Sequence, residues 1–254
     1  MNPKITVCTA THRRPDLLAR CIKSVQAQTF EDYEHIIFSD HCPKAKYVYE
    51  QFKSDERIRF FENQLPHVKN VGAVGQNFAI NNSNSNLICY LNDDNIFFPN
   101  HLEELYNALQ YHPIVFTRAL STKLGIGDNV IEKLSERTLE EDYNAVLNGE
   151  DVNESPMDML RLGHHKNVID SVGLWKSWAE MASAGRPDPH NEDGEFIARL
   201  ATYGRVHYVN SFTAMYYDRS ACKIKDDVYD KAIESVPEEQ AYIFEESLKK
   251  AGII

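Results

Sequence analysis

Two adjacent carboxylates, Asp93 and Asp94, follow a short apolar run at residues 87–91. An apolar run of this length between polar residues is typical of a buried strand, and ligands bind outside the carboxyl ends of strands in open α/β sheets. Neighbouring carboxylates repel each other unless a cation neutralises them, and such oxygen ligands suit Mg²⁺ or Mn²⁺. The pair therefore predicts a divalent-metal site that binds a diphosphate. A solvated turn is the alternative interpretation, because Asn and Asp are common turn residues.

A second acidic pair, Glu192 and Asp193, begins a segment whose apolar residues recur at helical spacing through residue 203. A carboxylate at this position could take a proton from an attacking hydroxyl, as a general base does. The alternative is structural, because acidic side chains in the first turn of a helix are stabilised by the helix dipole.

The elements that would position these acids alternate along the first hundred residues. The sequence predicts strands at residues 5–9, 33–38, 57–61 and 87–91 and helices at residues 17–25, 44–52 and 72–82, the first of them with Asp16 as its N-cap. This alternation is typical of a mostly parallel sheet with helices on its faces. The carboxyl ends of its strands would bring together residues 11–14, Asp40 and the Asp93–Asp94 pair.

The pattern is weaker in the rest of the chain. It predicts helices at residues 101–111, 172–182 and 192–203, strands at 114–116 and 205–209, an extended segment at 167–171 and a mainly helical tail at about 228–250. Residues 124–155 are interpreted as a loop-rich excursion and a candidate flap. No linker is evident, so we expect a single α/β domain.

The composition limits the function classes. Lys and Arg total 27 against 38 Asp and Glu, giving a net charge of -11, which argues against nucleic-acid binding because that needs a basic surface. Five scattered cysteines without C-x-x-C spacing argue against a zinc site and a disulfide framework. We see no signal peptide and no apolar run of membrane-spanning length, so we expect a cytoplasmic protein and leave peripheral membrane contact open.

Five segments, in their order and spacing, resemble the family 2 glycosyltransferases, which have the GT-A fold, and within that family the spore-coat polysaccharide synthesis members. The segments are ITVCTATHRRP, SVQAQTFEDYEHIIFSD, GQNFAI, YLNDDNIFFPN and EDGEFIARLATYG. The resemblance covers nearly the whole chain. It implies a nucleotide-binding half at residues 1–100, an acceptor-binding and catalytic half at residues 101–215 and a helical tail at residues 216–254.

The resemblance implies a nucleotide-diphosphate sugar as donor, with a UDP- or dTDP-sugar expected. The residues that match nucleotide-binding positions of the family are Thr9, Thr11, His12, Arg13, Asp40, Gln76, Asn77, Asn92 and Asp93. His12 stands where the spore-coat members have an aromatic residue that packs on uracil, and Asp40 matches the acid that accepts a hydrogen bond from the base. Between the two neighbouring arginines, Arg13 is the better candidate than Arg14 to reach a phosphate.

The resemblance also assigns the metal and the base. Asp94 matches the direct ligand of Mn²⁺ or Mg²⁺, with Asp93 facing the ribose or the sugar, and Asp193 matches the catalytic base. One base and no nucleophile on the far face of the sugar imply a single displacement with inversion.

Three residues are candidates to contact the acceptor, a glycan or another hydroxyl compound: Glu192, His165 and Trp175. Two of them have a structural alternative: Glu192 could be only a first-turn acid of the helix, and Trp175 could be a core residue. Adjacent residues of a strand point to opposite faces, so His164 and His165 are not expected to share a metal ion.

Two other functions stay open at this point. A nucleotidyltransferase also uses an acidic metal pair on an α/β sheet, but that class usually begins with a glycine-rich phosphate loop and residues 10–15 contain no glycine. A nucleotide-sugar-binding protein could keep the fold without turnover. A homodimer is compatible with the sequence.

Overall fold

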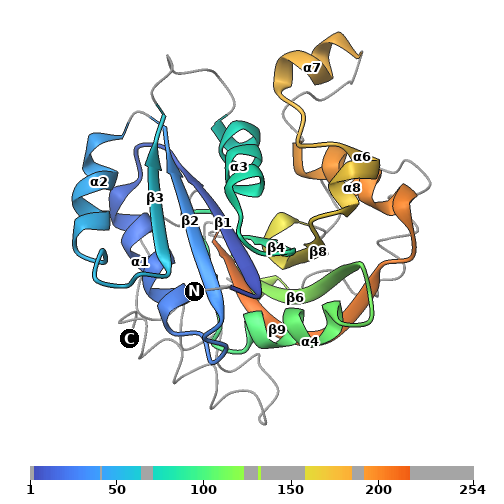
Figure 1. Ribbon diagram of the computed structural model, residues 1–254, viewed down its shortest axis with the longest axis horizontal. Coiled ribbons are helices and arrows are strands. Elements are labelled where there is room, and N and C mark those ends of the chain that lie inside the picture. The colour runs from blue at the N-terminus through green and yellow to red at the C-terminus, as the bar shows by residue number, and fades with distance from the viewer. Residues whose placement is uncertain are drawn as a thin grey trace.

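The computed structural model (Figure 1) describes residues 3–40, 42–63, 71–122, 131–132, 158–184 and 192–217. Within these ranges the strands form one nine-stranded sheet, in the order β3-β2-β1-β4-β8-β6-β9-β5, with β7 paired to β6. The sheet runs continuously from the first half of the chain into the second, so the predicted α/β architecture is confirmed.

The first half of the sheet is parallel, as the alternating pattern predicts. Its strands are β1 (Ile5–Thr11), β2 (Tyr33–Ser39), β3 (Ile58–Glu62) and β4 (Leu87–Tyr90), and its helices are α1 (Pro15–Gln26), α2 (Pro43–Glu50) and α3 (Val71–Asn82). The helices α1 and α2 cover one face and α3 covers the other (Figure 1). Because both faces are covered, β1 and β2 are apolar along most of their length.

Antiparallel pairing dominates the second half. The elements are β5 (Ile96–Phe97), α4 (His101–Leu109), β6 (Ile114–Thr122), β7 (Ile131–Glu132), η1 (Met159–Arg161), β8 (Leu162–His165), α6 (Val168–Val172), α7 (Trp178–Ser183), α8 (Glu192–Tyr203) and β9 (His207–Tyr217). Strand β8 pairs antiparallel with both β4 and β6, whereas β9 runs parallel to β6. Helix α4 packs under this part of the sheet, and α6 and α8 lie on its other side (Figure 1).

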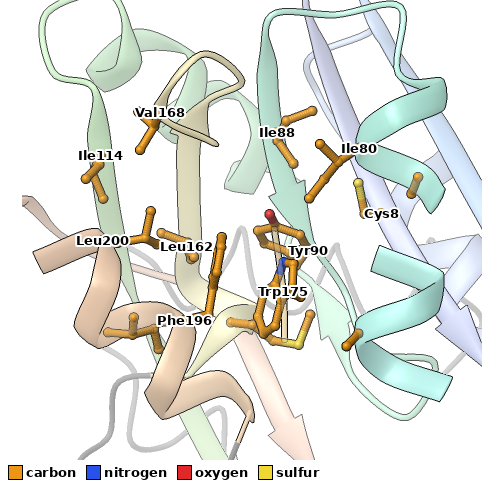
Figure 2. Packing of buried hydrophobic residues seen from close by; sticks show 14 of the residues in the cluster. Cys8, Ile80, Ile88, Tyr90, Ile114, Leu162, Val168, Trp175, Phe196 and Leu200 are labelled. Carbon is orange, nitrogen blue, oxygen red and sulfur yellow. The ribbon is translucent and has the colours of Figure 1, made fainter. Parts of the chain in front are cut away.

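An aromatic cluster joins the two halves between α3 and α8 (Figure 2). The ring of Trp175 stacks on Phe196 with centroids 4.1 Å apart and meets Tyr90 edge-on at 5.2 Å. Tyr90 and Phe196 are 6.2 Å apart at their centroids. Rings in these geometries add to the stabilisation that comes from burying their area, so the cluster fixes α8 against the end of β4.

Two predicted elements between β8 and α8 are wrong. Residues 167–171, expected to be extended, lie mostly in α6, and the helix expected at residues 172–182 is absent from residues 173–177. Gly173 has φ 78°, a backbone conformation that ends α6. Helix α7 then begins after Ser177, whose side chain forms a capping box with Glu180.

The first helix also begins earlier than predicted. Asp16 was expected to be its N-cap, but the cap position is held by Arg14 and Pro15 is the first helical residue. Proline suits that position because its fixed φ is helical and because an N–H in the first turn has no acceptor within the helix, so its absence costs nothing. Asp16 lies in the first turn, where its charge still favours the helix dipole.

The other predicted elements are found with small shifts of their ends, and α8 has the predicted bounds. No pattern in the sequence predicts β8 or η1, and β9 extends well beyond the strand expected at residues 205–209. Apart from β7, the segment at 124–155 lies outside the described residues, as does the tail at 228–250. No described helix is long and apolar enough to cross a bilayer.

Candidate nucleotide and metal site

Polar side chains gather where the parallel strands β1, β2 and β4 end. Thr11 is the last residue of β1, Asp40 follows β2, and Asp93 follows β4 by three positions. The backbone N–H of Asp40 donates to the carbonyl of Thr11 at 3.0 Å, and the N–H of Leu91 donates to the carbonyl of Cys8 at 3.0 Å. The strand pairing therefore continues to the edge of the sheet and brings these three loops together.

Asp93 is fully buried at this edge, at 0% exposure. The hydroxyl of Thr11 donates to its Oδ2 at 2.6 Å, and Nη2 of Arg14 lies 2.8 Å from its Oδ1. Burial raises the pKa of Asp93 to about 7, against the opposing effect of Arg14 and with a contribution from the charge of Asp94.

Asp94 lies nearer to the solvent, with its side chain 14% exposed. Its Oδ2 pairs with Nη1 of Arg14, so a single guanidinium bridges both carboxylates. Arg20 donates from Nη2 to the backbone carbonyl of Asp94 at 2.7 Å. Arg14 at the N-cap of α1 and Arg20 within α1 thus supply positive charge to the turn after β4.

The side chains of Asp93 and Asp94 fit a hard divalent cation, because both offer carboxylate oxygens and Asp94 is partly open to solvent. Across the described ranges, no group of three or more His, Cys, Asp or Glu residues could hold a metal ion. A cation bound at this edge would therefore take several ligands from water or from a diphosphate, as Mg²⁺ usually does.

His12 and Asp40 form a second contact at the same edge. Nδ1 of His12 lies 2.8 Å from the carbonyl oxygen of Asp40 and 3.4 Å from its Oδ2. The amide of Asn63 donates to the other carboxylate oxygen of Asp40 at 2.5 Å. The structure thus holds His12 and Asp40 side by side.

Two of the predicted nucleotide-binding residues have partners inside the fold. The hydroxyl of Thr9 is buried, donates to the carbonyl of Leu91 at 2.8 Å and lies 2.9 Å from Nε2 of His35. Asn77 bonds the backbone of Trp175 through both atoms of its amide. These contacts engage the polar atoms of both side chains with other parts of the fold.

The two neighbouring arginines differ in their placement. Arg13 is exposed and has φ 56°, the only positive φ outside glycine among the described residues. Arg14 reaches the carboxylates instead. The preference for Arg13 rested on sequence position alone, whereas the turn at Arg13 directs the chain so that Arg14 faces the strand ends. Nothing in the sequence distinguished the two.

Other predicted residues lie around the same edge. Gln76 is buried beside Gly75, where α3 packs closely on β1. The backbone carbonyl of Asn92 accepts from the N–H of Asn95 at 3.0 Å in the turn that carries the acidic pair. A Cβ at Gly75 would lie 2.7 Å from the Cβ of Ala10, so only glycine allows α3 to approach β1 this closely.

The Glu192–Asp193 pair lies in the first turn of α8, and both residues are partly exposed. Phe196, three residues after Asp193, packs against Tyr90, three residues before Asp93. The aromatic cluster of Figure 2 therefore connects the start of α8 to the turn that bears the acidic pair.

A further buried acid on α8 was not expected from the sequence. Glu195 is 4% exposed and forms ion pairs with Arg199 at 2.7 Å and with Lys176 at 2.9 Å. Arg199 also donates to the carbonyls of Gly173 and Leu174 at 3.0 and 2.9 Å. The i,i+4 spacing of Glu195 and Arg199 predicts such a pair. No sequence pattern predicts their partners outside α8.

The two histidines of β8 face opposite sides of the sheet. His164 donates from Nδ1 to the carbonyl of His165 at 2.8 Å, so its Nε2 accepts from the hydroxyl of Tyr90 at 2.7 Å. Nε2 of His165 lies 2.7 Å from the carbonyl of Leu109 at the end of α4. The two imidazoles therefore have different partners, Tyr90 for His164 and the end of α4 for His165.

Trp175 is 3% exposed within the aromatic cluster. This agrees with the core interpretation of Trp175, and its ring has no open face for an acceptor sugar. His165 is likewise held by α4, and among the three candidate acceptor residues Glu192 is the one placed beside Asp193.

Comparison with known proteins gives one family match. The family described as Glycosyl transferase family 2 matches residues 6–160, more than half of the chain. A GalNAc(5)-diNAcBac-PP-undecaprenol beta-1,3-glucosyltransferase of Campylobacter jejuni is 31% identical over 143 residues, which cover 55% of this chain and 45% of that protein. Protein CgeD of Bacillus subtilis is 26% identical over 118 residues, covering 44% of this chain and 28% of that protein. The chain thus spans less than half the length of these curated relatives.

Solved structures confirm the fold. S. aureus TarS 1–349 in complex with UDP-GlcNAc superposes with a TM-score of 0.65 at 10% identity, covering 97% of this chain and 72% of that one. The mannosyltransferase PcManGT from Pyrobaculum calidifontis, in complex with GDP-Man and Mn²⁺, superposes with a TM-score of 0.57 at 11% identity, covering 100% and 74%. These likenesses show the expected GT-A fold. The particular likeness to spore-coat members is not tested by them and stays a prediction.

Proposed function

The chain belongs to the family 2 glycosyltransferases, and we propose that it transfers a sugar from a nucleoside-diphosphate donor to an acceptor hydroxyl in a metal-dependent, inverting reaction. The observation that carries this proposal is the arrangement at the carboxyl ends of the parallel strands. The buried Asp93 and the adjacent Asp94 lie beside Thr11, and His12 lies against Asp40. One edge of the sheet therefore offers an acidic pair that could bind a cation and a separate acid, Asp40, that could bind the nucleobase.

We assign the donor to this edge. Asp94, with Asp93 behind it, would hold Mn²⁺ or Mg²⁺, and a bound ion of this kind stabilises the charge that develops on a departing diphosphate. One carboxylate oxygen of Asp40 accepts from the amide of Asn63. Asp40 would also accept a hydrogen bond from the nucleobase, and the ring of His12 would pack on that nucleobase. We expect uracil or thymine as the base.

Asp193 would take the proton of the acceptor hydroxyl as that oxygen attacks the anomeric carbon. Its place in the first turn of α8, tied to β4 through Phe196 and Tyr90, supports this assignment. A carboxylate in the first turn of a helix is stabilised as the anion, which is the form that a base needs. Attack opposite to the leaving diphosphate inverts the anomeric configuration.

We propose a glycan or another hydroxyl compound as acceptor, consistent with polysaccharide or glycoconjugate synthesis. Cytoplasmic location, peripheral membrane contact and a homodimer remain predictions from the sequence. The family match favours glycosyl transfer over nucleotidyl transfer. Kinetic measurements would distinguish a glycosyltransferase from a protein that binds nucleotide sugars without turnover.

A thermal-shift panel of UDP, dTDP and GDP, each with and without Mn²⁺, tests the donor site. A ligand that binds only the folded protein stabilises it by about 2.7 kcal/mol at a hundred times its Kd, so the cognate nucleotide with Mn²⁺ should raise Tm by several degrees. Asp94→Asn should lose the part of this shift that depends on Mn²⁺. Asp170→Asn, an exposed acid of α6, is the matched control and should keep it.

Absence of any nucleotide-dependent shift would overturn the donor site. An unchanged Mn²⁺-dependent shift in Asp94→Asn would remove Asp94 from the metal.

A further inference from the structure

The guanidinium of Arg14 contacts the same carboxylates that the proposed cation requires. Its Nη2 lies 2.8 Å from Oδ1 of Asp93, and its Nη1 pairs with Oδ2 of Asp94. A planar guanidinium can contact two carboxylates at once, and this one hydrogen-bonds Asp94 while it forms an ion pair with Asp93. The chain itself therefore already supplies one positive charge to the acidic pair.

The backbone fixes where Arg14 stands. The turn at Arg13, with φ 56°, precedes it, and Pro15 begins α1 directly after it. The carbonyl of Arg14 accepts the first hydrogen bond of α1 from the N–H of Leu18 at 3.0 Å. The backbone of Arg14 is thus held by the helix, while its side chain is about one-third exposed, at 36%.

A metal ion bound to Asp93 and Asp94 would meet Arg14 at the same carboxylates. Both need oxygens of Asp93 and Asp94, and two cations a few ångströms apart repel each other in a partly buried site. Removal of the guanidinium alone would leave a buried carboxylate without its counter-charge, which is costly. A diphosphate changes this balance, because it is a second anion that an arginine binds well.

We propose that Arg14 is a built-in counter-ion that competes with the divalent cation for Asp93 and Asp94, so that the pair takes the metal together with a nucleoside diphosphate. The phosphate oxygens then become the new partner of the guanidinium. This inference rests on the proposed function, since it assumes that the acidic pair binds a cation. It makes metal binding conditional on the donor, because the apparent affinity for the metal alone falls with the fraction of molecules in which the pair is free.

Mn²⁺ binding to the full chain without nucleotide tests the inference, measured by electron paramagnetic resonance of free Mn²⁺ and by calorimetry. Arg14→Met keeps an unbranched apolar stem and removes the guanidinium, so it should bind Mn²⁺ about tenfold more tightly or better. It should also melt at a lower temperature than wild type without metal and gain more Tm from Mn²⁺ than wild type gains. Lys23→Met removes one charge from an exposed position of the same helix and should match wild type.

UDP provides the second arm. In wild type it should raise the affinity for Mn²⁺ strongly, whereas in Arg14→Met the same addition should raise it less, because the competitor is already absent. Arg14→Lys, which keeps the charge but not the two-pronged contact, should give an intermediate affinity for Mn²⁺. This variant keeps the test decisive if Arg14→Met does not fold.

Equal affinity of wild type and both Arg14 variants for Mn²⁺ without nucleotide would overturn the inference. Metal-independent nucleotide binding by wild type would also overturn it, because Arg14 would then take the place of the metal ion instead of competing with it. Failure of the proposed function gives a different result: no form of the protein, including Arg14→Met, binds Mn²⁺ or a nucleotide.

Discussion

Asn77 of α3 exchanges two hydrogen bonds with the backbone of Trp175, donating from Nδ2 to its carbonyl at 2.8 Å and accepting its N–H on Oδ1 at 2.9 Å. The two residues are 98 positions apart. The contact joins the nucleotide-side helix to the loop between α6 and α7, and that loop also carries Lys176, the partner of Glu195 on α8. Asn77 thus connects the two halves of the fold.

Asn77→Ala should lower stability rather than nucleotide affinity. Both bonds are lost, at a net cost of roughly 0.5–1.5 kcal/mol each, so the free energy of unfolding in urea should fall by about 1–3 kcal/mol. Asn82→Ala, on the same helix, loses a bond to the carbonyl of Phe78 within α3 and should cost less. A large fall in UDP affinity with unchanged stability would contradict this role and support direct nucleotide contact.

Gly75→Ala should destabilise the protein although alanine favours helices. The new Cβ would lie 2.7 Å from the Cβ of Ala10 and 3.1 Å from the ring of Phe38, and overpacking of this kind typically costs about 1–3 kcal/mol. Urea unfolding should show a net loss of up to about 2 kcal/mol after the gain in helix propensity. Gly204→Ala is the control, because a Cβ there meets nothing within 4 Å. Equal stability of the two variants would show that α3 can move away from β1.

Asp193→Asn should lower acceptor-dependent transfer by about 10²–10⁴-fold, the usual contribution of a general base. Donor binding should persist, so the Tm shift with UDP and Mn²⁺ should match that of wild type. Product formation from a radiolabelled donor measures the rate, with Asp170→Asn as a matched change of charge. Transfer at the wild-type rate would remove Asp193 from its proposed role.

Acid should destabilise the fold through three buried histidines. Burial lowers the pKa of His35 to about 3, that of His101 to about 3 and that of His164 to about 4. A depressed pKa in the folded state means that unfolding takes up a proton below the ordinary value of about 6.5. Stability should therefore be complete above that pH and should fall between it and about pH 4, by about 1.4 kcal/mol per pH unit for each histidine.

His101→Phe measures one part of this effect. The ring of His101 stacks on Phe97 with centroids 3.6 Å apart, and its Nδ1 donates to the hydroxyl of Thr213 at 2.7 Å. The variant should be less stable at pH 7 because it loses that bond, but its urea-unfolding free energy should decline less steeply from pH 6.5 to pH 5. Parallel pH profiles for the two proteins would exclude His101 as a source of the acid sensitivity.

The sequence by itself determined the parallel half of the sheet, the bounds of α8 and the acidic pair after β4. These features depend on signals within a few residues: apolar runs for strands covered on both faces, a helical period for α8 and the polar break after residue 91. The family was also readable, because its motifs are short segments whose order and spacing are linear properties of the chain.

Only the tertiary structure decided which side chains serve the acidic edge and which serve the core. Arg14 faces the carboxylates 79 and 80 positions away, whereas Arg13 does not, because the positive φ at Arg13 turns the chain. The amide of Asn77 is occupied by Trp175, and the same contact, with the bonds from Arg199, holds residues 173–177 out of the helix that their pattern predicts. Partners so far apart in the chain leave no local pattern, since they meet only after the sheet has formed.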